Sequence, residues 1–331
     1  MNKKIIFAFA VVSLFVIAGC GGGNNEQRPI TDVDIRKGAD GLEMEFLSNA
    51  PPINVFEENP FPIAVELRNK GACHIGSQTG DCTTGEEGII VFGFEQAYVG
   101  AETAGEERQE FGIKGKSIIN PNGDMEFVTI DAQTKKISAQ SETHPSTIFA
   151  TACYPYKTIF GGSVCVDPDI YGMLKGEKAC DIKAMPFPNS QGAPVAVTKI
   201  ETRMLPEIGE DKVRPHFFIF IENKGNGEVV NLSKVEKACT NEALEPEDFN
   251  SIQITATLSG KTLDCSVDDN GPGTETVRLR DKKYLVRCTL TLEDGIDVGR
   301  DAYTAPLSIE MEYGYTFTIS KDIIIEKILK Y

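Results

Sequence analysis

Cysteine is the residue type with the most evident chemistry in this chain, because a thiol can form a disulfide, ligate a metal ion or carry a lipid. The sequence has nine cysteines, one of which, Cys20, lies close to the N-terminus. The remaining eight are an even number, which favours a disulfide framework in an exported protein. A metal site is disfavoured because there is no Cys-x-x-Cys motif. These eight are Cys73, Cys82, Cys153, Cys165, Cys180, Cys239, Cys265 and Cys288.

The spacing of the cysteines ranks the pairings without fixing them, since eight cysteines allow 105 connectivities. Two bridges are expected to be local. A third bridge is expected to link one of the first five cysteines to one of the last three. Each group has an odd number of cysteines, so pairing within the group leaves one cysteine over. The predicted pairs are Cys73 with Cys82, Cys265 with Cys288, and Cys180 with Cys239.

Short acidic clusters are weak candidates for Ca²⁺ binding, because carboxylate oxygens are the ligands that this ion prefers. None has the alternating register with a distal Glu that marks an EF-hand, and turn formation explains them without a metal. We therefore predict no cofactor. The weak candidates are Asp167, Asp169, Asp268 and Asp269. Asn231-Leu232-Ser233 is the only glycosylation sequon, so Asn231 is a candidate acceptor if the host modifies exported proteins.

Catalytic motifs are missing from the sequence. The three histidines, His74, His144 and His216, are far apart in the chain. There is no G-x-S-x-G, H-E-x-x-H, phosphate-binding loop or G-x-G-x-x-G. We predict that the protein is not an enzyme. The alternative is a hydrolase whose active residues are dispersed among loops, which a sequence alone does not reveal.

The charge balance limits the partners. The 331 residues include 33 Lys and Arg against 49 Asp and Glu, a formal net charge of −16. So acidic a surface repels phosphate instead of releasing counterions from it. Nucleic acid is therefore excluded as a partner.

The N-terminus reads as an export signal. Lys3 and Lys4 precede an uncharged run, 5–18, that is short for a membrane-spanning helix. The run ends in Ile17-Ala18-Gly19-Cys20, which resembles the lipobox of prokaryotic lipoproteins. The resemblance implies cleavage after residue 19 and acyl chains such as palmitate on Cys20. The protein would then be held at the cell membrane through that lipid, facing away from the cytoplasm, with residues 20–38 as a flexible tether.

The rest of the chain consists of short alternating stretches broken by Gly, Pro, Asn and Asp, which is typical of half-buried strands. A short helix is expected at 232–238 and a helical turn at 246–249, and Gly161-Gly162 is expected to form a tight turn. The predicted strands are 42–46, 63–67, 125–130, 147–153, 157–166, 195–203, 217–222, 252–258, 284–292, 307–313 and 316–325.

A strand ending in Asn-Lys-Gly occurs twice, at Asn69-Lys70-Gly71 and Asn223-Lys224-Gly225, 154 residues apart. The proline-rich segment 188–194 lies between the copies and is the predicted linker. A strand that ends in this way resembles the CARDB-like and related immunoglobulin-like domains of archaeal and bacterial cell-surface proteins. The resemblance implies an all-β fold of two tandem antiparallel immunoglobulin-like β-sandwiches, 39–187 and 195–331.

These observations together predict a membrane-anchored extracytoplasmic lipoprotein that acts as a structural or protein-interaction module on the cell surface. Its expected partner is another envelope protein. Besides the anchored hydrolase, the alternative is an envelope-assembly or ligand-binding subunit.

Overall fold

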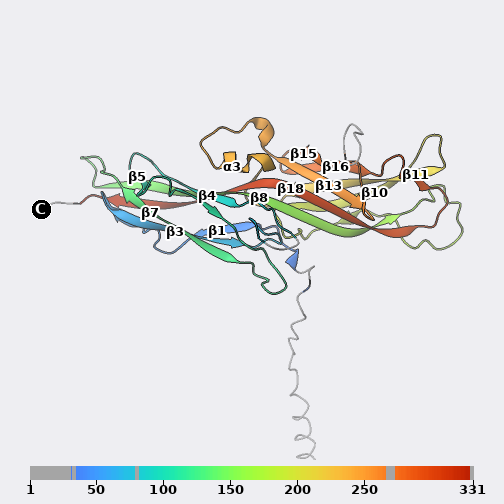
Figure 1. The fold of residues 1–331 in the computed structure, drawn as a ribbon, viewed down its shortest axis with the longest axis horizontal. Helices are drawn as coiled ribbons and strands as arrows, with labels where there is room; N and C mark the ends of the chain where they lie inside the picture. The colour runs from blue at the N-terminus through green and yellow to red at the C-terminus, as the bar shows by residue number, and fades with distance from the viewer. Residues whose placement is uncertain (1–30, 32–34, 79–81, 266–272, 329–331) are drawn as a thin grey trace, which may run out of the picture. The chain divides into compact units, whose positions relative to one another are not determined.

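Two strands of 24 residues each, β8 (Thr143–Val166) and β18 (Tyr303–Glu326), dominate the fold. They pair antiparallel over their full lengths, and Figure 1 shows them side by side through the centre of the ribbon. At about 3.3 Å per residue each strand spans roughly 80 Å. The computed structural model describes residues 31, 35–78, 82–265 and 273–328. None of the helices in these ranges is long and apolar enough to cross a membrane.

The β8–β18 pair is the centre of a nine-stranded sheet. Its main path runs β14-β13-β18-β8-β4-β6, and β2, β12 and β15 pair at its sides. Only the β2–β18 pairing is parallel among the strands that the structure describes. The other members are β2 (Asn54–Phe56), β4 (Gly88–Gly93), β6 (Arg108–Phe111), β12 (Glu228–Val230), β13 (Ser251–Leu258), β14 (Lys261–Thr262) and β15 (Glu275–Arg278).

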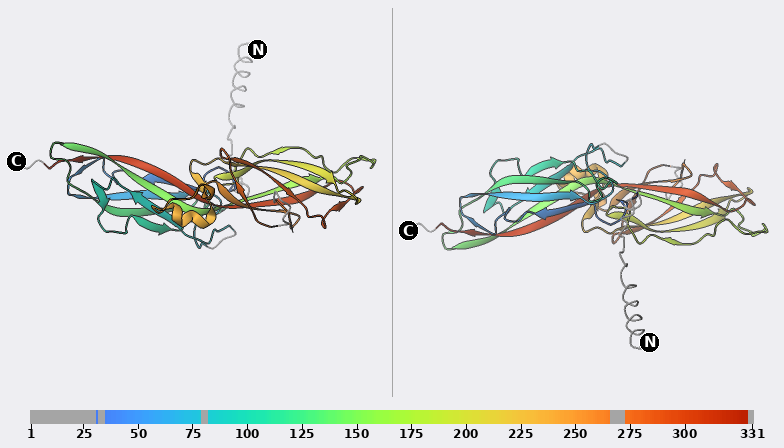
Figure 2. Two further views of the ribbon diagram at one scale, coloured as in Figure 1. Left: turned by 90° about the horizontal axis from the view of Figure 1, so that it is seen from above. Right: turned by 90° about the horizontal axis from the view of Figure 1, so that it is seen from below.

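Two smaller antiparallel sheets complete the fold. The four-stranded sheet has the order β1-β3-β7-β5, and the five-stranded sheet has the order β16-β11-β10-β9 with β17 beside β11. In Figure 2 the blue and teal strands of the first sheet lie beside one half of the long strands, and the yellow-green and yellow strands of the second lie beside the other half. Their strands are β1 (Leu42–Phe46), β3 (Pro60–Asn69), β5 (Val99–Ala101), β7 (Met125–Thr134), β9 (Met185–Pro186), β10 (Val195–Pro206), β11 (Lys212–Asn223), β16 (Lys283–Thr289) and β17 (Ile296–Asp297).

The period-two pattern of the long strands explains how one sheet carries two others. Buried side chains alternate along most of β8, from Ser146 to Val166, so the same face points inward along the strand. In β18 the buried positions include Ala305 at one end and Ile325 at the other. One hydrophobic cluster contains residues of all three sheets. The long strands therefore contribute to the core on both sides of their midpoint.

The predicted strands lie on observed strands, except that 284–292 continues beyond the end of β16 at Thr289. The two long strands are longer than predicted. The ranges 147–153 and 157–166 are one strand, β8, and 307–313 and 316–325 are one strand, β18. The predicted tight turn at Gly161-Gly162 is wrong, because these glycines pair with Ser308 and Leu307 inside the ladder, a few residues before β8 ends. Pairing with β18 holds this glycine pair extended, although glycine is rare inside strands.

The predicted helical segments are confirmed. Residues Leu232–Lys234 form the 3₁₀ turn η1, which continues into the single-turn helix α3 (Val235–Ala238), and Pro246–Asp248 form η2. The chain is thus all-β in its described part apart from these short turns.

Residues Thr31–Tyr331 form one compact unit. Within the predicted linker, residues 190–194 are buried. They lead directly into β10, whose first residue, Val195, contacts both long strands. The division of the body into two sandwich domains stays a prediction.

Candidate functional site

The centre of the β8–β18 ladder holds four tyrosines on its inward face. Tyr154 lies opposite Tyr315 and Tyr156 lies opposite Tyr313. The rings of neighbours in this tyrosine cluster are 5.7 to 6.4 Å apart between centroids. Such tilted and edge-on arrangements are the favourable ones for aromatic pairs. Each phenol has a polar end that must find a partner in the core, and the partners come from the two Asn-Lys-Gly turns and the strands next to them.

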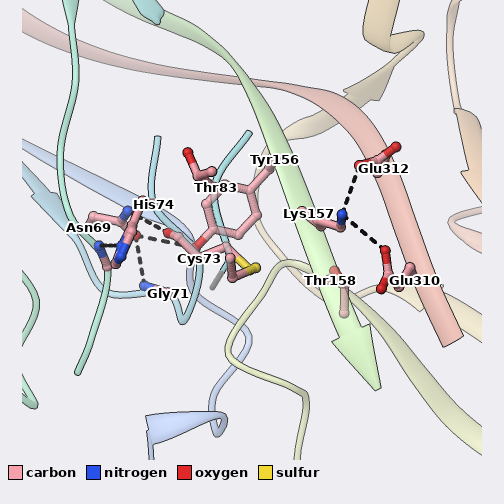
Figure 3. Close-up of a disulfide and its surroundings, with 12 residues drawn as sticks. Asn69, Gly71, Cys73, His74, Thr83, Tyr156, Lys157, Thr158, Glu310 and Glu312 are labelled. Carbon is pink, nitrogen blue, oxygen red and sulfur yellow. Dashed lines mark hydrogen bonds and ion pairs between the residues drawn. A yellow bond between two sulfur atoms is a disulfide. The ribbon is translucent and has the colours of Figure 1, made fainter. Parts of the chain in front are cut away.

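At the first turn, Asn69 organises the backbone and receives one tyrosine. The Tyr156 hydroxyl donates to Asn69 Oδ1 at 3.2 Å, and the Gly71 N–H donates to the same oxygen at 3.0 Å. Asn69 Nδ2 in turn donates to the carbonyls of Cys73, at 2.8 Å, and Ile113, at 3.1 Å. Figure 3 shows this group beside the Cys73 disulfide. The buried amide is therefore satisfied on both sides, as buried polar groups require.

The second turn repeats the same contacts. The Tyr315 hydroxyl donates to Asn223 Oδ1 at 3.4 Å, and the Gly225 N–H donates to that oxygen at 3.1 Å. Asn223 Nδ2 donates to the Gly227 carbonyl at 3.0 Å, four residues further on, as Asn69 does to Cys73. The repeat in the sequence is thus also a repeat of side-chain contacts.

The other two tyrosines hold the first residues of two strands. The Leu42 N–H at the start of β1 donates to the Tyr154 hydroxyl at 3.2 Å. The Val195 N–H at the start of β10 donates to the Tyr313 hydroxyl at 3.3 Å. In the second case Thr158 adds a contact, with its hydroxyl 3.0 Å from that of Tyr313 and donating to the Val195 carbonyl at 2.7 Å. The cluster therefore ties both smaller sheets to the long strands.

Burial dominates the electrostatics of the cluster. Desolvation raises the pKa of Tyr154, Tyr156 and Tyr313, and raises the pKa of Tyr315 to about 12. All four phenols are therefore neutral hydrogen-bonding groups and not bases or nucleophiles at ordinary pH. The cluster is structural in its chemistry.

The outer face of the long strands carries charge at the same level. Lys157 Nζ lies 3.0 Å from a carboxylate oxygen of Glu310 and 3.0 Å from one of Glu312, both on β18 (Figure 3). These side chains are partly exposed, so the pairing is a modest cross-strand contact.

Two small grooves lie along the long strands, and Tyr315 of the tyrosine cluster lines the first of them. The first, of about 310 Å³, lies between the start of β1 and the second Asn-Lys-Gly turn, with Asp40, Lys224, Tyr315 and Phe317 in its lining. The second, of about 450 Å³, is lined by Phe160 and Phe187 and by other residues from the segments at its edge. Their volumes are at the low end for sites that hold small organic ligands. The residues that complete the second groove are Arg36, Lys37, Ile159, Gly161, Asn189, Ser190 and Gln191.

All eight cysteines of the body are bridged, as predicted. The local pairs Cys73–Cys82 and Cys265–Cys288 are confirmed. The predicted pairing of Cys180 with Cys239 is wrong. Cys180 bridges to Cys165 and Cys239 bridges to Cys153. The physical reason is that β8 continues to Val166, which takes Cys165 away to the end of the long strand and leaves Cys153 beneath helix α3. Four disulfides indicate an oxidising, extracytoplasmic environment.

The acidic candidates for Ca²⁺ have other partners where they are described. Asp169 accepts backbone N–H bonds from Met173 and Leu174, and these bonds lower its pKa. Asp167 pairs with Lys178. Asp268 and Asp269 lie outside the described residues, as does Cys20. Within the described ranges, no group of three or more His, Cys, Asp or Glu side chains is arranged to hold a metal ion.

The histidines and the sequon are dispersed, and each has local contacts. His74 Nδ1 accepts the Gly115 N–H at 2.9 Å, and desolvation lowers the pKa of His74. His144 pairs with Glu95 at 3.1 Å, and His216 is buried in β11. Asn231 caps η1 by accepting the Ser233 N–H. Its glycosylation stays a prediction.

The tyrosines are the site residues that sequence reasoning missed. Tyr154-Pro155-Tyr156 and Tyr313-Gly314-Tyr315 are two Tyr-x-Tyr motifs at nearly the same spacing as the two Asn-Lys-Gly turns. The repeated order of turn and Tyr-x-Tyr was therefore visible in the sequence, and it would have identified the partners of each asparagine.

No protein-family model matches the sequence. No curated protein matches it either. Among solved structures, the chain aligns with the C-terminal domain of the antigen I/II-family protein AspA of Streptococcus pyogenes. The alignment has 7% identity, covers 87% of this chain and 100% of that one, and has a TM-score of 0.16.

Proposed function

We propose that the protein is a membrane-anchored extracytoplasmic lipoprotein, lipidated at Cys20, whose body acts as a structural or protein-interaction module. The body would consist of two immunoglobulin-like sandwich halves, the first around β3 and the second around β11. The two halves share β8 and β18 instead of being joined by a flexible linker.

The observation that carries this proposal is the continuity of the two long strands through the tyrosine cluster. Bending between the halves would break a ladder of backbone hydrogen bonds and expose buried phenols, each of which costs free energy. A module of this kind keeps its two ends at a fixed distance. That property suits a scaffold, whereas an enzyme usually needs a deep pocket with converging polar groups.

The segment that would lead from the lipid enters the body near its middle. Gly38 forms a β-bridge with Gln191, and the Gly192 N–H donates to the Gly38 carbonyl at 3.0 Å. Gln191 and Gly192 lie just before Val195 and thus close to the tyrosine cluster. The chain that follows Cys20 would therefore join the body close to the tyrosine cluster.

The anchoring part is tested with the full chain and its Cys20→Ala variant in the native host. Mass spectrometry of the mature protein should find a diacylglyceryl-modified N-terminal Cys20, and the variant should leave the membrane fraction. An N-terminus at Met1, or unchanged membrane partitioning of the variant, would contradict the lipoprotein proposal.

The interaction part is tested by crosslinking in intact membranes followed by a screen of hydrolase substrates. We expect a reproducible crosslinked envelope protein and no turnover. Turnover that disappears on substitution of one loop carboxylate or serine would favour the hydrolase alternative.

A further inference from the structure

The inference concerns one end of the long strand pair, which we call the far end. There β8 stops at Val166 opposite Tyr303, where β18 begins. Three loops gather there, which we call the far-end loops: 167–184, 207–211 and 290–302. In Figures 1 and 2 the corresponding yellow-green and orange-red segments lie together at the end of the ribbon opposite the C-terminus.

Specific contacts join two of the far-end loops to each other and fix the third to β8. The Val298 N–H donates to the Asp211 carbonyl at 3.0 Å, and β17 pairs with the first residues of β11. The Cys165–Cys180 disulfide closes the long loop onto the end of β8. Loops fixed in this way lose little conformational entropy when a partner binds.

Large apolar side chains of these loops point into solvent. Ile208 is fully exposed, and Met173, Tyr171 and Leu292 are 67%, 65% and 59% exposed. The loops that carry Ile208 and Leu292 are adjacent, because β17 pairs with β11. Exposed apolar side chains that lie near one another mark recognition surfaces more often than single ones do. Aromatic residues and methionine are also the types that interface centres favour.

The charge around these apolar side chains is strongly negative. The three loops contain eleven Asp and Glu and four Lys and Arg. Several of these carboxylates are already paired, for example Asp167 with Lys178 and Asp297 with Arg300. Glu177, Asp211 and Asp301 form no ion pair within the described part of the chain. The negative excess repels anionic lipid and nucleic acid and attracts a basic surface.

We infer that the far-end loops are a docking surface for a protein partner that presents an apolar patch surrounded by Lys and Arg. Ile208 and Leu292 would insert into the apolar part, and the surrounding carboxylates would meet the basic rim. The inference deepens the proposed function by naming the surface and the chemistry of its partner, but it does not require the lipid on Cys20.

The test uses the full chain in nanodiscs of neutral lipid and three synthetic helical peptides, of Leu and Lys, of Leu and Glu, and of Ser and Lys. We expect the Leu–Lys peptide to bind most tightly. The double variant Ile208→Ser/Leu292→Ser should weaken that binding by about tenfold, as loss of two apolar contacts predicts. The control Ile119→Ser, at a residue that is 95% exposed outside these loops, should leave it unchanged.

The charge requirement has its own variants. Asp211→Asn/Asp301→Asn should weaken the Leu–Lys peptide several-fold at low salt and have little effect at high salt, because screening removes the attraction. All these variants alter exposed side chains, and unchanged urea unfolding curves would show that they fold.

Three results would overturn the inference. They are equal binding of the Leu–Glu peptide, a double variant that binds as the parent chain does, and binding of phosphatidylglycerol vesicles that the double variant abolishes. The last would identify a lipid surface instead. Failure here with intact anchoring and crosslinking would leave the proposed function standing, whereas a Cys20→Ala variant that stays in the membrane would contradict the anchor but not this surface.

Discussion

After the first Asn-Lys-Gly turn the chain enters a loop closed by the Cys73–Cys82 disulfide, whereas after the second it passes directly into strand β12. The asparagine makes the same contacts in both places, with a tyrosine hydroxyl and with a carbonyl four residues ahead. The contacts of the asparagine are therefore common to both halves, whereas the segment that follows the turn differs between them.

The halves also differ in how tightly the turn is enclosed. Tyr156 is completely buried against Gly71, whereas Tyr315 borders the first groove beside Gly225. The same substitution in the two halves should therefore lower the free energy of unfolding by different amounts, and the difference measures how much more tightly one turn is enclosed.

The largest expected effect is the loss of the bridge between the halves. Cys153–Cys239 links residues 86 apart in sequence, against 9 for Cys73–Cys82. We expect Cys153→Ala/Cys239→Ala to lower the free energy of unfolding by about 4 kcal/mol, because the longer loop releases more chain entropy. Cys73→Ala/Cys82→Ala, the control within one half, should cost about 2 to 3 kcal/mol by the same relation. Urea unfolding measures both, and equal losses would contradict the loop-length argument.

The next effect comes from the turn glycines. A Cβ on Gly71 would lie 1.6 Å from the Tyr156 hydroxyl and 2.9 Å from the Gly192 carbonyl oxygen, whereas on Gly225 it would lie 2.2 Å from the Tyr315 hydroxyl and 2.7 Å from Pro194 Cβ. We expect Gly71→Ala to cost about 3 kcal/mol and Gly225→Ala about 2 kcal/mol, because the less enclosed tyrosine can shift.

Gly161→Ala is the matched control for the glycine comparison. Gly161 lies in β8, and a Cβ added there would have no atom within 4 Å, so the free energy of unfolding should change by less than about 0.5 kcal/mol. If Gly225→Ala lowered the free energy of unfolding more than Gly71→Ala does, the second turn would be the more tightly enclosed one.

A smaller difference is expected between the tyrosines that hold the strand starts. Tyr154→Phe removes the acceptor of the Leu42 N–H, while Tyr313→Phe removes the acceptor of the Val195 N–H and a contact with Thr158. We expect losses of about 1 and about 2 kcal/mol, since a buried N–H is left without a partner in both. The double-mutant cycle of Tyr313→Phe with Thr158→Val should show coupling, and strict additivity would mean that the extra hydroxyl contact contributes nothing.

The last prediction concerns the alkaline sensitivity of the cluster. A phenol whose pKa is raised in the folded state ionises first in the unfolded chain, so stability falls as the pH rises. For Tyr315 the loss should begin near the ordinary tyrosine value and be complete as the pH passes about 12. Urea midpoints from about pH 9 to about pH 12, followed with tyrosinate absorbance, measure it. In Tyr315→Phe the urea midpoint should fall less steeply with pH. An unchanged fall would contradict the burial of the Tyr315 hydroxyl.

The repeat and the strands were predictable from the sequence because both depend on local chemistry. Alternating apolar residues define half-buried strands such as β1 and β3, and Asn-Lys-Gly tolerates the backbone of a turn wherever it occurs. The even number of cysteines likewise predicts a disulfide framework without any knowledge of the fold.

Only the tertiary structure decided how these elements continue and meet. A strand interrupted by Pro155 or by Gly161-Gly162 looks like two short strands in sequence, and it becomes one when a partner ladder and a buried face hold it extended. That continuity places Cys165 at the end of β8, where it bridges to Cys180, and it leaves Cys153 in the middle of β8 as the partner of Cys239. It also brings four tyrosines from two repeats into one cluster, because pairing across the ladder depends on register and not on distance along the chain.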